Sequence, residues 1–339
     1  MKAARAQLRP TGFGDGVPLA GGPVRFAQFA LTIGAASSVV PVDGLAAALA
    51  ALPSASRAHI ERLRDRILAP RPPVAGLDFG RPHVMGILNA TPDSFSDGGD
   101  RRGDPAELAR AMIAAGASII DIGGESTRPR APLVTLDEEL ARVGPLLDAL
   151  RDDGPRLSID TRKAGVMARA LAAGVAMVND VSALTHDPAA LSLVAAAGCP
   201  VVLMHAQGTP QTMQDNPVYD DVVGDVFDWF DARIDACVAA GIARERIVVD
   251  PGIGFGKTLA HNLALLRDIA VFHGLGCPIL LGVSRKYMIR QLADAAIGDR
   301  LPGSLALALH GVAHGVQIVR VHDVAATVQA LRLWSAVAR

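Results

Sequence analysis

The feature that most constrains this chain is a regular alternation of short apolar runs with longer helical runs, which begins at His83 and continues to the C-terminus. Short apolar runs that are bounded by turn residues are typical of buried strands in a parallel sheet. There are eight such runs, and we predict a strand over each of 83–88, 118–122, 156–159, 176–178, 200–204, 247–249, 278–282 and 317–321.

A helical pattern follows each predicted strand. The pairs Asp104-Pro105 and Asp187-Pro188 each place an N-cap residue before a proline at the first helical position, which is a common way for a helix to begin. Eight strand–helix units predict an α/β fold, a (β/α)8 TIM barrel with an N-terminal extension. The expected helices are 105–115, 136–151, 164–173, 188–197, 221–240, 259–272, 304–314 and a last one over 324–336.

Residues 1–80 lack this alternation, and we assign them to an extension of unknown role that precedes a barrel over 81–339. The extension is interrupted by proline and glycine at its start, and then carries an Ala-rich run over 43–52 and a predicted helix over 56–68. Three prolines between 70 and 73 end that helix and mark a junction. A chain of 339 residues is long enough for one barrel and such an appendage.

The composition excludes several classes of function. A formal net charge of −1 gives no footprint for nucleic acid, and no apolar run approaches the ~18 residues of a membrane span. The apolar stretch 26–38 follows several prolines and begins too late for a signal peptide. Three widely spaced cysteines indicate free thiols in a reducing compartment. We therefore expect a cytoplasmic protein that acts on small molecules, without nucleic-acid or membrane partners.

Polar residues end the predicted strands, which is where a TIM barrel carries its site. Folding does not require all eight apolar strands to end in this way, so we predict that these residues form one ring around a ligand. A single Asp at a strand end is usually a helix N-cap, and we expect that role for Asp180. The other members of the ring are Asn89, Asp121, Asp160, Asn179, His205, Asp250, Ser284-Arg285-Lys286, Arg320 and His322.

One part of the ring suits a flat, nitrogen-rich heterocycle. A carboxylate accepts two parallel hydrogen bonds from a ring N–H and an adjacent amine, an asparagine offers a donor and an acceptor, and a lysine ammonium donates to a ring carbonyl. Apolar side chains nearby would contact the faces of the heterocycle. The residues predicted for these tasks are Asp160, Asn179, Asp250 and Lys286, with Met204 and Phe255 against the faces.

Another part of the ring suits a phosphate-like anion and a metal ion. Arg320 and His322 lie two residues apart, so they project from one face of the last strand, next to the start of the last helix. Asn89 offers a neutral oxygen, which suits an Mg²⁺ ion held mostly by water and phosphate oxygens. The ring therefore predicts a heterocycle, an anion and magnesium.

Two motifs are set aside. The run from Gly252 to Thr258 resembles a Walker A loop, but the glycine that this motif needs is replaced by Pro251, and we expect a tight turn instead. His310 and His314 have metal-ligand spacing on a helix, yet no HExxH motif or third ligand accompanies them, so we expect a structural role.

Seven motifs in order give the chain a strong resemblance to the dihydropteroate synthases of the folate pathway, over about residues 83 to 335. They are GILNATPDSFSDGG, DIGGESTRP, SIDTRK, NDVSA, DPGIGFGKT, GVSRK and RVHDV. The resemblance implies an enzyme that makes 7,8-dihydropteroate and diphosphate from 6-hydroxymethyl-7,8-dihydropterin diphosphate and p-aminobenzoate. It also implies a homodimer that pairs through the last helices.

The resemblance also implies roles for individual residues. Asp160, Asn179, Asp250 and Lys286 would hold the pterin; Arg320, His322 and Thr127 would bind the diphosphate, with Asn89 on Mg²⁺. Two loops, 90–103 and 124–136, would close over the site. We expect an SN1-like loss of diphosphate, with Asp97 stabilising the pterin methylene cation and Phe95 and Pro129 lining the p-aminobenzoate slot. The implied substrate site also includes Arg128, Met204, Phe255 and Gly282, and the implied catalytic residues are Asp97, Lys286, Arg320 and His322.

Two other functions stay open. A methyltetrahydrofolate:corrinoid methyltransferase would share a pterin-holding barrel but would need no diphosphate pocket. A non-catalytic pterin-binding paralogue would be expected to lose loop residues such as Asp97, Thr127 and Arg128, all of which are present. Tyr287 departs from the smaller residue that many relatives carry after the lysine of the GVSRK motif, which alters the expected contact with the p-aminobenzoate carboxylate.

Overall fold

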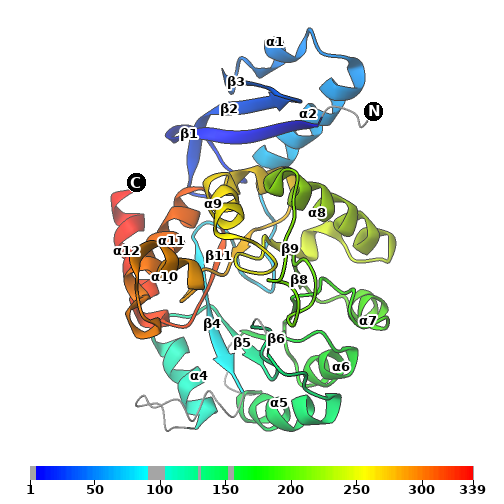
Figure 1. Cartoon of the computed structure of the whole chain (residues 1–339), viewed down its shortest axis with the longest axis vertical. Coiled ribbons are helices and arrows are strands. Elements are labelled where there is room, and N and C mark those ends of the chain that lie inside the picture. The colour runs from blue at the N-terminus through cyan, green and yellow to red at the C-terminus, as the bar shows by residue number, and fades with distance from the viewer. Residues whose placement is uncertain (1–4, 91–103, 129–130, 152–155, 339) are drawn as a thin grey trace.

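The structure is a computed structural model that describes residues 5–90, 104–128, 131–151 and 156–338. Its barrel is an eight-stranded parallel sheet (Figure 1). The strand order is β10-β11-β4-β5-β6-β7-β8-β9, and a parallel bridge between Val249 and Ile279 joins the two ends of the sheet. All eight predicted strands are present, with ends that differ by one or two residues. They are β4 (His83–Asn89), β5 (Ile119–Gly123), β6 (Arg156–Asp160), β7 (Met177–Asp180), β8 (Val201–Met204), β9 (Ile247–Asp250), β10 (Leu280–Leu281) and β11 (Ile318–Val321).

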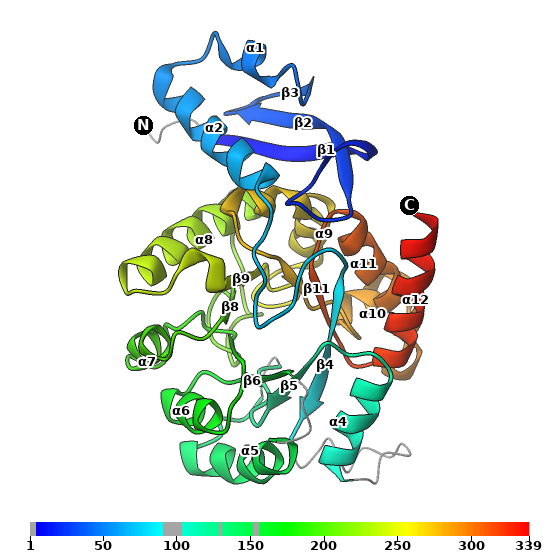
Figure 2. The ribbon, with the colours of Figure 1, turned by 180° about the vertical axis from the view of Figure 1, so that it is seen from behind.

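Helices surround the strands on the outside of the barrel (Figure 2). The predicted helix over 259–272 is in fact an α-helix and a 3-10 segment that meet at Asp268, and the short helix α10 was not predicted. Within the described residues no helix is long and apolar enough to cross a membrane. The barrel helices are α4 (Pro105–Ala114), α5 (Leu136–Leu150), α6 (Ala164–Ala172), α7 (Ala190–Ala197), α8 (Val222–Ala239), α9 (Leu259–Arg267), α10 (Tyr287–Ala293), α11 (Leu301–Ala313) and α12 (Val324–Val337), and the 3-10 segments are η1 (Arg244–Arg246), η2 (Ile269–Leu275) and η3 (Ile297–Asp299).

Of three aspartates at strand and loop ends, Asp104, Asp180 and Asp187, only Asp104 caps the helix that follows it. Asp104 accepts a hydrogen bond from the Ala106 amide at the start of α4, as predicted. The prediction for Asp187-Pro188 was wrong, because α7 begins at Ala190 and has no side-chain cap. Asp187 instead accepts from the Ala189 amide before α7 and from the Ala164 amide at the start of α6. The prediction for Asp180 was wrong in one respect, because no helix begins there. Its carboxylate instead accepts from the amides of residues 182 and 184 and closes a tight turn.

The extension contains an antiparallel sheet that the sequence analysis did not predict. Strands β1 (Ala6–Pro18), β2 (Arg25–Ile33) and β3 (Ala36–Pro41) lie in the order β1-β2-β3, followed by helices α1 (Leu45–Leu49) and α2 (Ser54–Leu68). The apolar stretch 26–38 lies in β2 and β3. Strand β1 and helix α2 pack against η2, so the extension is stacked on the barrel at the edge that carries α8 and η2 (Figures 1 and 2).

The segment between α2 and β4 closes one end of the barrel. Val74, Leu77 and Phe79 are buried in a cluster with one inward-facing apolar residue from most of the strands, near their amino ends. Since side chains along a strand alternate between its faces, the inward-facing residue two positions later lies nearer the carboxyl end. Those later positions hold the polar groups of the predicted ring.

Candidate functional site

We call the layer of residues above the apolar cluster at the amino ends of the strands the floor of the site. The two-residue period of the strands determines which residues belong to it. Each apolar residue of the lower layer is followed, two positions on, by a residue that faces the same interior nearer the carboxyl end. The pairs are Ile119 and Asp121, Met177 and Asn179, Val202 and Met204, Val248 and Asp250, Leu280 and Gly282, and Ile318 and Arg320. Four predicted ring members, Asp121, Asn179, Asp250 and Arg320, therefore lie in one layer with Met204 and Gly282, above an apolar plug.

Arg320 joins three strands of this floor. Its Nε donates to Asp121 Oδ2 of β5 over 2.6 Å, and its terminal nitrogen donates to Asp160 Oδ2 of β6 over 2.7 Å. Burial works against the charged form of Arg320, but the two carboxylates outweigh burial and raise its pKa above the ordinary value. The guanidinium thus lies among carboxylates, because a buried cation requires counter-charges.

Asn179 has its amide orientation fixed by Asp121. The Asn179 Nδ2 group donates to Asp121 Oδ2 over 2.9 Å, which leaves its carbonyl oxygen for another partner. Among the described residues, the Oδ1 atoms of Asp121 and Asp160 are buried without a hydrogen-bond partner. Burial raises the pKa of Asp160; Arg320 opposes this shift and Asp121 adds to it. Buried acceptors that lack donors indicate a place for a ligand rich in N–H groups.

Asp250 and Lys286 form the opposite side of the floor. Asp250 Oδ1 accepts from the Gly252 amide over 2.8 Å, and burial raises its pKa while that amide and Lys286 lower it. The Lys286 Nζ lies 4.1 Å from the centre of the Phe255 ring, a cation–π contact, and burial lowers its pKa to about 8. A Cβ atom at Gly282 would lie 3.8 Å from Asp250 Oδ2, an ordinary contact, so Gly282 lies next to this carboxylate.

The turn over 251–258 carries Phe255 and is tightly constrained. Gly252, Gly254 and Gly256 all have positive φ, and a Cβ at Gly252 or Gly256 would come within 2.5 Å of the His205 or Gln207 carbonyl oxygen. The structure therefore agrees with the prediction of a tight turn. Lys257 is buried in this turn, and its Nζ lies 3.0 Å from His205 Nδ1, whose ring packs against Trp229 of α8.

His322 lies at the rim, where β11 meets α12. Its Nδ1 is 3.0 Å from Ser284 Oγ, and burial, together with Arg285 and Arg320, lowers its pKa to about 3, so the imidazole is neutral at pH 7. Arg285 adopts a left-handed conformation, φ 57°, and pairs with Asp323. Arg320, two residues before His322, instead contacts the carboxylates of β5 and β6, so the two side chains have different partners.

The loop that follows β5 carries Thr127 and Arg128, and a buried charge cluster fixes its base. Glu125 accepts from Arg162 over 2.9 Å and from Lys163 over 3.0 Å, and Lys163 also binds Glu139. The charge of Arg128 contributes to the lowered pKa values of Lys286 and His322, after burial and other groups.

Three predicted site residues, Phe95, Asp97 and Pro129, lie outside the described residues. Asn89 ends β4 and is half-buried, next to Gly123 of β5. A single amide oxygen fits an Mg²⁺ ion that takes most of its ligands from water and substrate oxygens. The Asn89 oxygen alone does not suit a metal ion whose ligands all come from the protein. The described residues also contain no cluster of three His, Cys, Asp or Glu side chains that would hold such an ion.

Three buried residues of the site have contacts that no sequence pattern predicted. Asp121 was a predicted ring member without a function, and Glu125 and Lys257 had no predicted role. Each is 6% exposed or less, although a charged side chain is almost never fully buried unless it is paired. Their partners lie far along the chain, 199 residues away in the case of Asp121 and Arg320, so spacing gives no signal.

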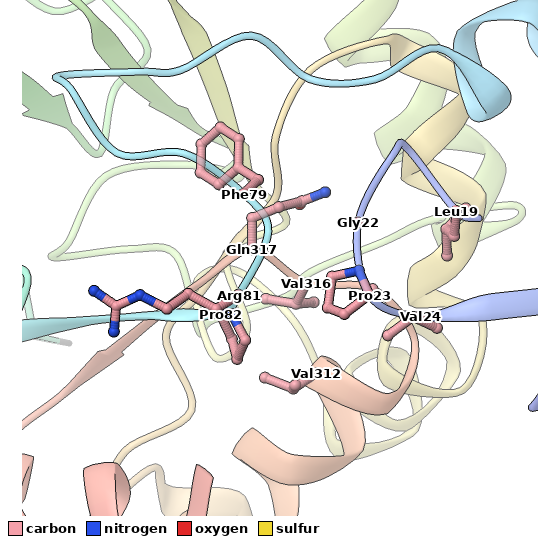
Figure 3. Close-up of a pocket in the computed structure, with 11 residues that line it drawn as sticks. Leu19, Gly22, Pro23, Val24, Phe79, Arg81, Pro82, Val312, Val316 and Gln317 are labelled. Atoms are coloured by element: carbon pink, nitrogen blue, oxygen red, sulfur yellow. The ribbon is translucent and has the colours of Figure 1, made fainter. Parts of the chain in front are cut away.

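Features away from the ring have structural explanations. His310 binds the Leu266 carbonyl and His314 binds the His310 carbonyl, in accord with the structural role expected for them. A small groove lies at the other end of the barrel, between the extension and α11 (Figure 3). Its lining residues, such as Pro23, Phe79 and Val312, are mostly apolar and bring together none of the predicted site residues.

Comparison with known proteins identifies the class of barrel. Residues 85–322 match the family described as pterin binding enzyme, and the chain belongs to that family. The matched region runs from β4 to the end of β11, so it includes every strand of the barrel.

The relatives within this family are dihydropteroate synthases. The chain is 49% identical over 260 residues to dihydropteroate synthase of Escherichia coli K12, which covers 76% of this chain and 92% of that protein. The structure of the Yersinia pestis dihydropteroate synthase with a sulfonamide drug has a TM-score of 0.74 and 47% identity, and the match covers 77% of this chain and 96% of that one. The Burkholderia cenocepacia dihydropteroate synthase, solved with 7,8-dihydropteroate, has a TM-score of 0.70 and 48% identity over 77% of this chain and 93% of that one.

Proposed function

We propose that this protein condenses 6-hydroxymethyl-7,8-dihydropterin diphosphate with p-aminobenzoate, giving 7,8-dihydropteroate and diphosphate. It is a transferase of folate biosynthesis. The observation that carries the proposal is that the chain belongs to the pterin binding enzyme family. The buried polar layer supports it, because Arg320 links Asp160 to Asp121, which in turn holds Asn179, while Asp250 lies where Lys286 favours its ionised form. The product bound in the Burkholderia cenocepacia relative is the product of this reaction.

The floor suits the pterin edge. A pterin presents an amine and ring N–H groups beside a ring carbonyl and a ring nitrogen. The buried Asp160 Oδ1 atom and the Asp250 carboxylate would accept from the N–H groups, and the fixed Asn179 carbonyl would accept another. Lys286 would donate to the carbonyl, while Met204 and Phe255 would contact the faces of the ring system.

The reaction is a displacement at the methylene carbon attached to the pterin. The C–O bond to diphosphate breaks first, and its electron pair leaves with the diphosphate. The aniline nitrogen of p-aminobenzoate then forms the C–N bond and loses a proton to solvent. Because that nitrogen is a weak base that loses its proton readily once bonded, the step needs no strong general base.

Several residues would stabilise the departing anion. Arg128, His322, Thr127 and the amino end of α12 would bind the diphosphate oxygens, and Arg320 would add positive charge beneath them. Binding of an anion would favour the protonated form of His322, whose pKa is low without one. Asn89 would hold an Mg²⁺ ion, which when bound neutralises charge on the diphosphate.

An assay of diphosphate release tests the proposal. Pterin diphosphate should release diphosphate when p-aminobenzoate is added and should be stable without it. A methyltransferase would instead demethylate methyltetrahydrofolate with a corrinoid acceptor, and a non-catalytic paralogue would bind pterin without turnover. Either result would contradict the proposal.

Asp97 is proposed to stabilise the pterin methylene cation. A carboxylate near a developing cation acts in the transition state more than in the bound ground state. Asp97→Ala should therefore reduce turnover far more than it weakens binding of pterin diphosphate. Turnover by rapid quench and binding by calorimetry measure the two effects, and equal losses would contradict this role.

We also propose a homodimer in the cytoplasm. Leu333 and Val337 of α12 are 65% and 85% exposed, which supports pairing through the last helices. Light scattering tests this, and a monomer at micromolar concentration would contradict it. The three cysteines are free thiols, which suits a reducing compartment.

A further inference from the structure

The loop that follows β8 has its two ends joined by one side chain. We call residues 207–218 the β8 loop. Gln207 Nε2 donates to the Val218 carbonyl over 3.1 Å, and Gln207 Oε1 accepts from the Val218 amide over 3.0 Å. Inside the loop the Thr209 carbonyl accepts from the amides of Thr212 and Met213, and the Met213 side chain is buried. A loop with joined ends and its own packed side chain is a compact unit, so the β8 loop can act as a fixed support.

On one side the β8 loop is attached to the turn over 251–258. Gln214 Nε2 donates to the Gly254 carbonyl over 2.8 Å, and the Tyr219 hydroxyl, next to the loop, donates to the Gly256 carbonyl over 2.8 Å. A Cβ atom at Gly254 would lie 3.4 Å from Lys286 Cδ. Gln214 therefore holds a peptide group that lies against the lysine proposed to bind the pterin.

On its other side the β8 loop contacts the loop after β5. Gln211 Nε2 donates to the Ala131 carbonyl over 3.0 Å, although the two residues are 80 positions apart in the chain. Strands β6 and β7 lie between β5 and β8 in the sheet. This hydrogen bond therefore joins two loops whose strands are not neighbours.

The position of Ala131 also fixes the backbone of Arg128. The Ala131 amide donates to the Arg128 carbonyl over 3.1 Å, so the peptide group that Gln211 holds is bonded in turn to the arginine. Arg142 donates to the Gly124 carbonyl over 2.9 Å and holds the start of the same loop. Arg128 lies between these two attachments, and its own side chain is exposed.

We propose that Gln211 is a positioning residue for the diphosphate of the substrate: through Ala131 it holds the backbone of Arg128, whose guanidinium binds the diphosphate oxygens. This inference rests on the proposed function, which gives Arg128 that task. A cation that is already in place loses less conformational entropy when the anion binds. A purely structural role for Gln211 would not distinguish a pterin that carries a diphosphate from one that does not.

The test is calorimetric titration of 6-hydroxymethylpterin and of its diphosphate ester into the wild type and Gln211→Ala, with Mg²⁺ and without p-aminobenzoate. We expect the variant to bind the ester about fivefold more weakly, the size of effect that one net hydrogen bond gives, and to bind the unesterified pterin as the wild type does. Equal losses for the two ligands, or no loss for the ester, would overturn the inference.

Gln214→Ala is the matched control, because it removes the same side chain three positions further along the same loop. It breaks the hydrogen bond on the pterin side, so both ligands should bind more weakly by the same factor. Both glutamines are exposed, so neither change removes buried packing. If Gln214→Ala weakened binding of the ester alone, as expected for Gln211→Ala, the effect would belong to the whole loop and the inference would be overturned.

A double variant tests whether Gln211 acts through Arg128. Once Arg128→Ala has removed the guanidinium, adding Gln211→Ala should cause no further loss of affinity for the ester. A further fivefold loss would mean that Gln211 acts by another route, and would overturn the inference. If the wild type binds neither ligand, or if Arg128→Ala binds the ester as tightly as the wild type does, the proposed function or its diphosphate site fails instead.

Discussion

At the scale of single residues, Asp121 does the most to organise the floor. It is fully buried and accepts from both Arg320 and Asn179. Asp121→Asn would leave the shape but remove the charge that Arg320 faces, and breaking a buried pair in this way costs about 3 kcal/mol. We expect a loss of that order in the free energy of unfolding, measured by urea denaturation at pH 7, together with weaker pterin binding.

Asp215→Asn is the control for this change, because Asp215 is exposed in the loop after β8 and should alter stability by less than about 0.5 kcal/mol. If Asp121→Asn were as stable as this control, Arg320 would not depend on Asp121 as a counter-charge. The remaining carboxylate, Asp160, would then be sufficient.

At the scale of elements, the sequence predicts the barrel better than the extension, for a physical reason. Strands of a parallel barrel are buried on both faces, so they read as continuous apolar runs such as Val201–Met204. Strand β1 is an antiparallel strand with exposed positions, and it contains Pro10 and three glycines. A shift of register between Phe13 and Val17 accommodates two of those glycines, so residues that usually break strands lie inside this one.

The site residues, too, were predictable where their position depends on nearby sequence and were not where it depends on distant parts of the chain. The polar residues at strand ends were predictable, because the apolar run before each one marks where the strand stops, as for Asp250 and Arg320. The pairing of Arg320 with Asp121 and Asp160 could not be predicted, because it depends on which strands become neighbours. Helix α10 was missed because its buried residues, Met288 and Ile289, are adjacent and give no helical period.

The element whose position depends most on charge is the loop after β5. Glu125 lies between Arg162 and Lys163; burial alone would raise its pKa, but the two hydrogen-bonded cations outweigh burial and lower it. A carboxyl with a lowered pKa contributes stability above its unfolded pKa, about 4.3, and loses it as the pH falls through its folded pKa. We expect Glu125→Gln to cost about 3 kcal/mol at pH 7.

Urea denaturation at pH 7 and at pH 3 measures this prediction, and the difference from the wild type should become smaller at pH 3. Glu107→Gln is the control, because Glu107 is 69% exposed in a pair with Arg110 and should change stability by less than about 0.5 kcal/mol. A difference that is equal at both pH values would indicate lost packing rather than lost charge.

At the scale of the whole molecule, the extension is attached to the barrel by apolar contacts and by a small number of arginines. Phe26 and Phe29 of β2 are fully buried in the same core as α8 and η2. Arg66 binds Asp231 over 3.0 Å, and Arg71 donates to the His273 carbonyl over 2.9 Å. These contacts join the extension to elements of the barrel, so we expect the two parts to unfold together.

Arg5 makes the largest charge contact between the two parts. It binds Asp221, Asp225 and Asp228 over 2.9, 2.8 and 2.7 Å, and these three carboxylates lie within the first turns of α8 or just before it. Arg5→Ala would leave them facing one another, although partial exposure to solvent screens the repulsion. We expect a loss of about 1 kcal/mol at low ionic strength that largely disappears in 1 M NaCl, measured by urea denaturation, and faster amide exchange at the start of α8. Arg64→Ala, which breaks an exposed pair with the adjacent Asp65 on α2, should leave α8 exchange unchanged. A loss for Arg5→Ala that did not depend on salt would mean that the arginine attaches the extension by packing of its side chain and not by its charge.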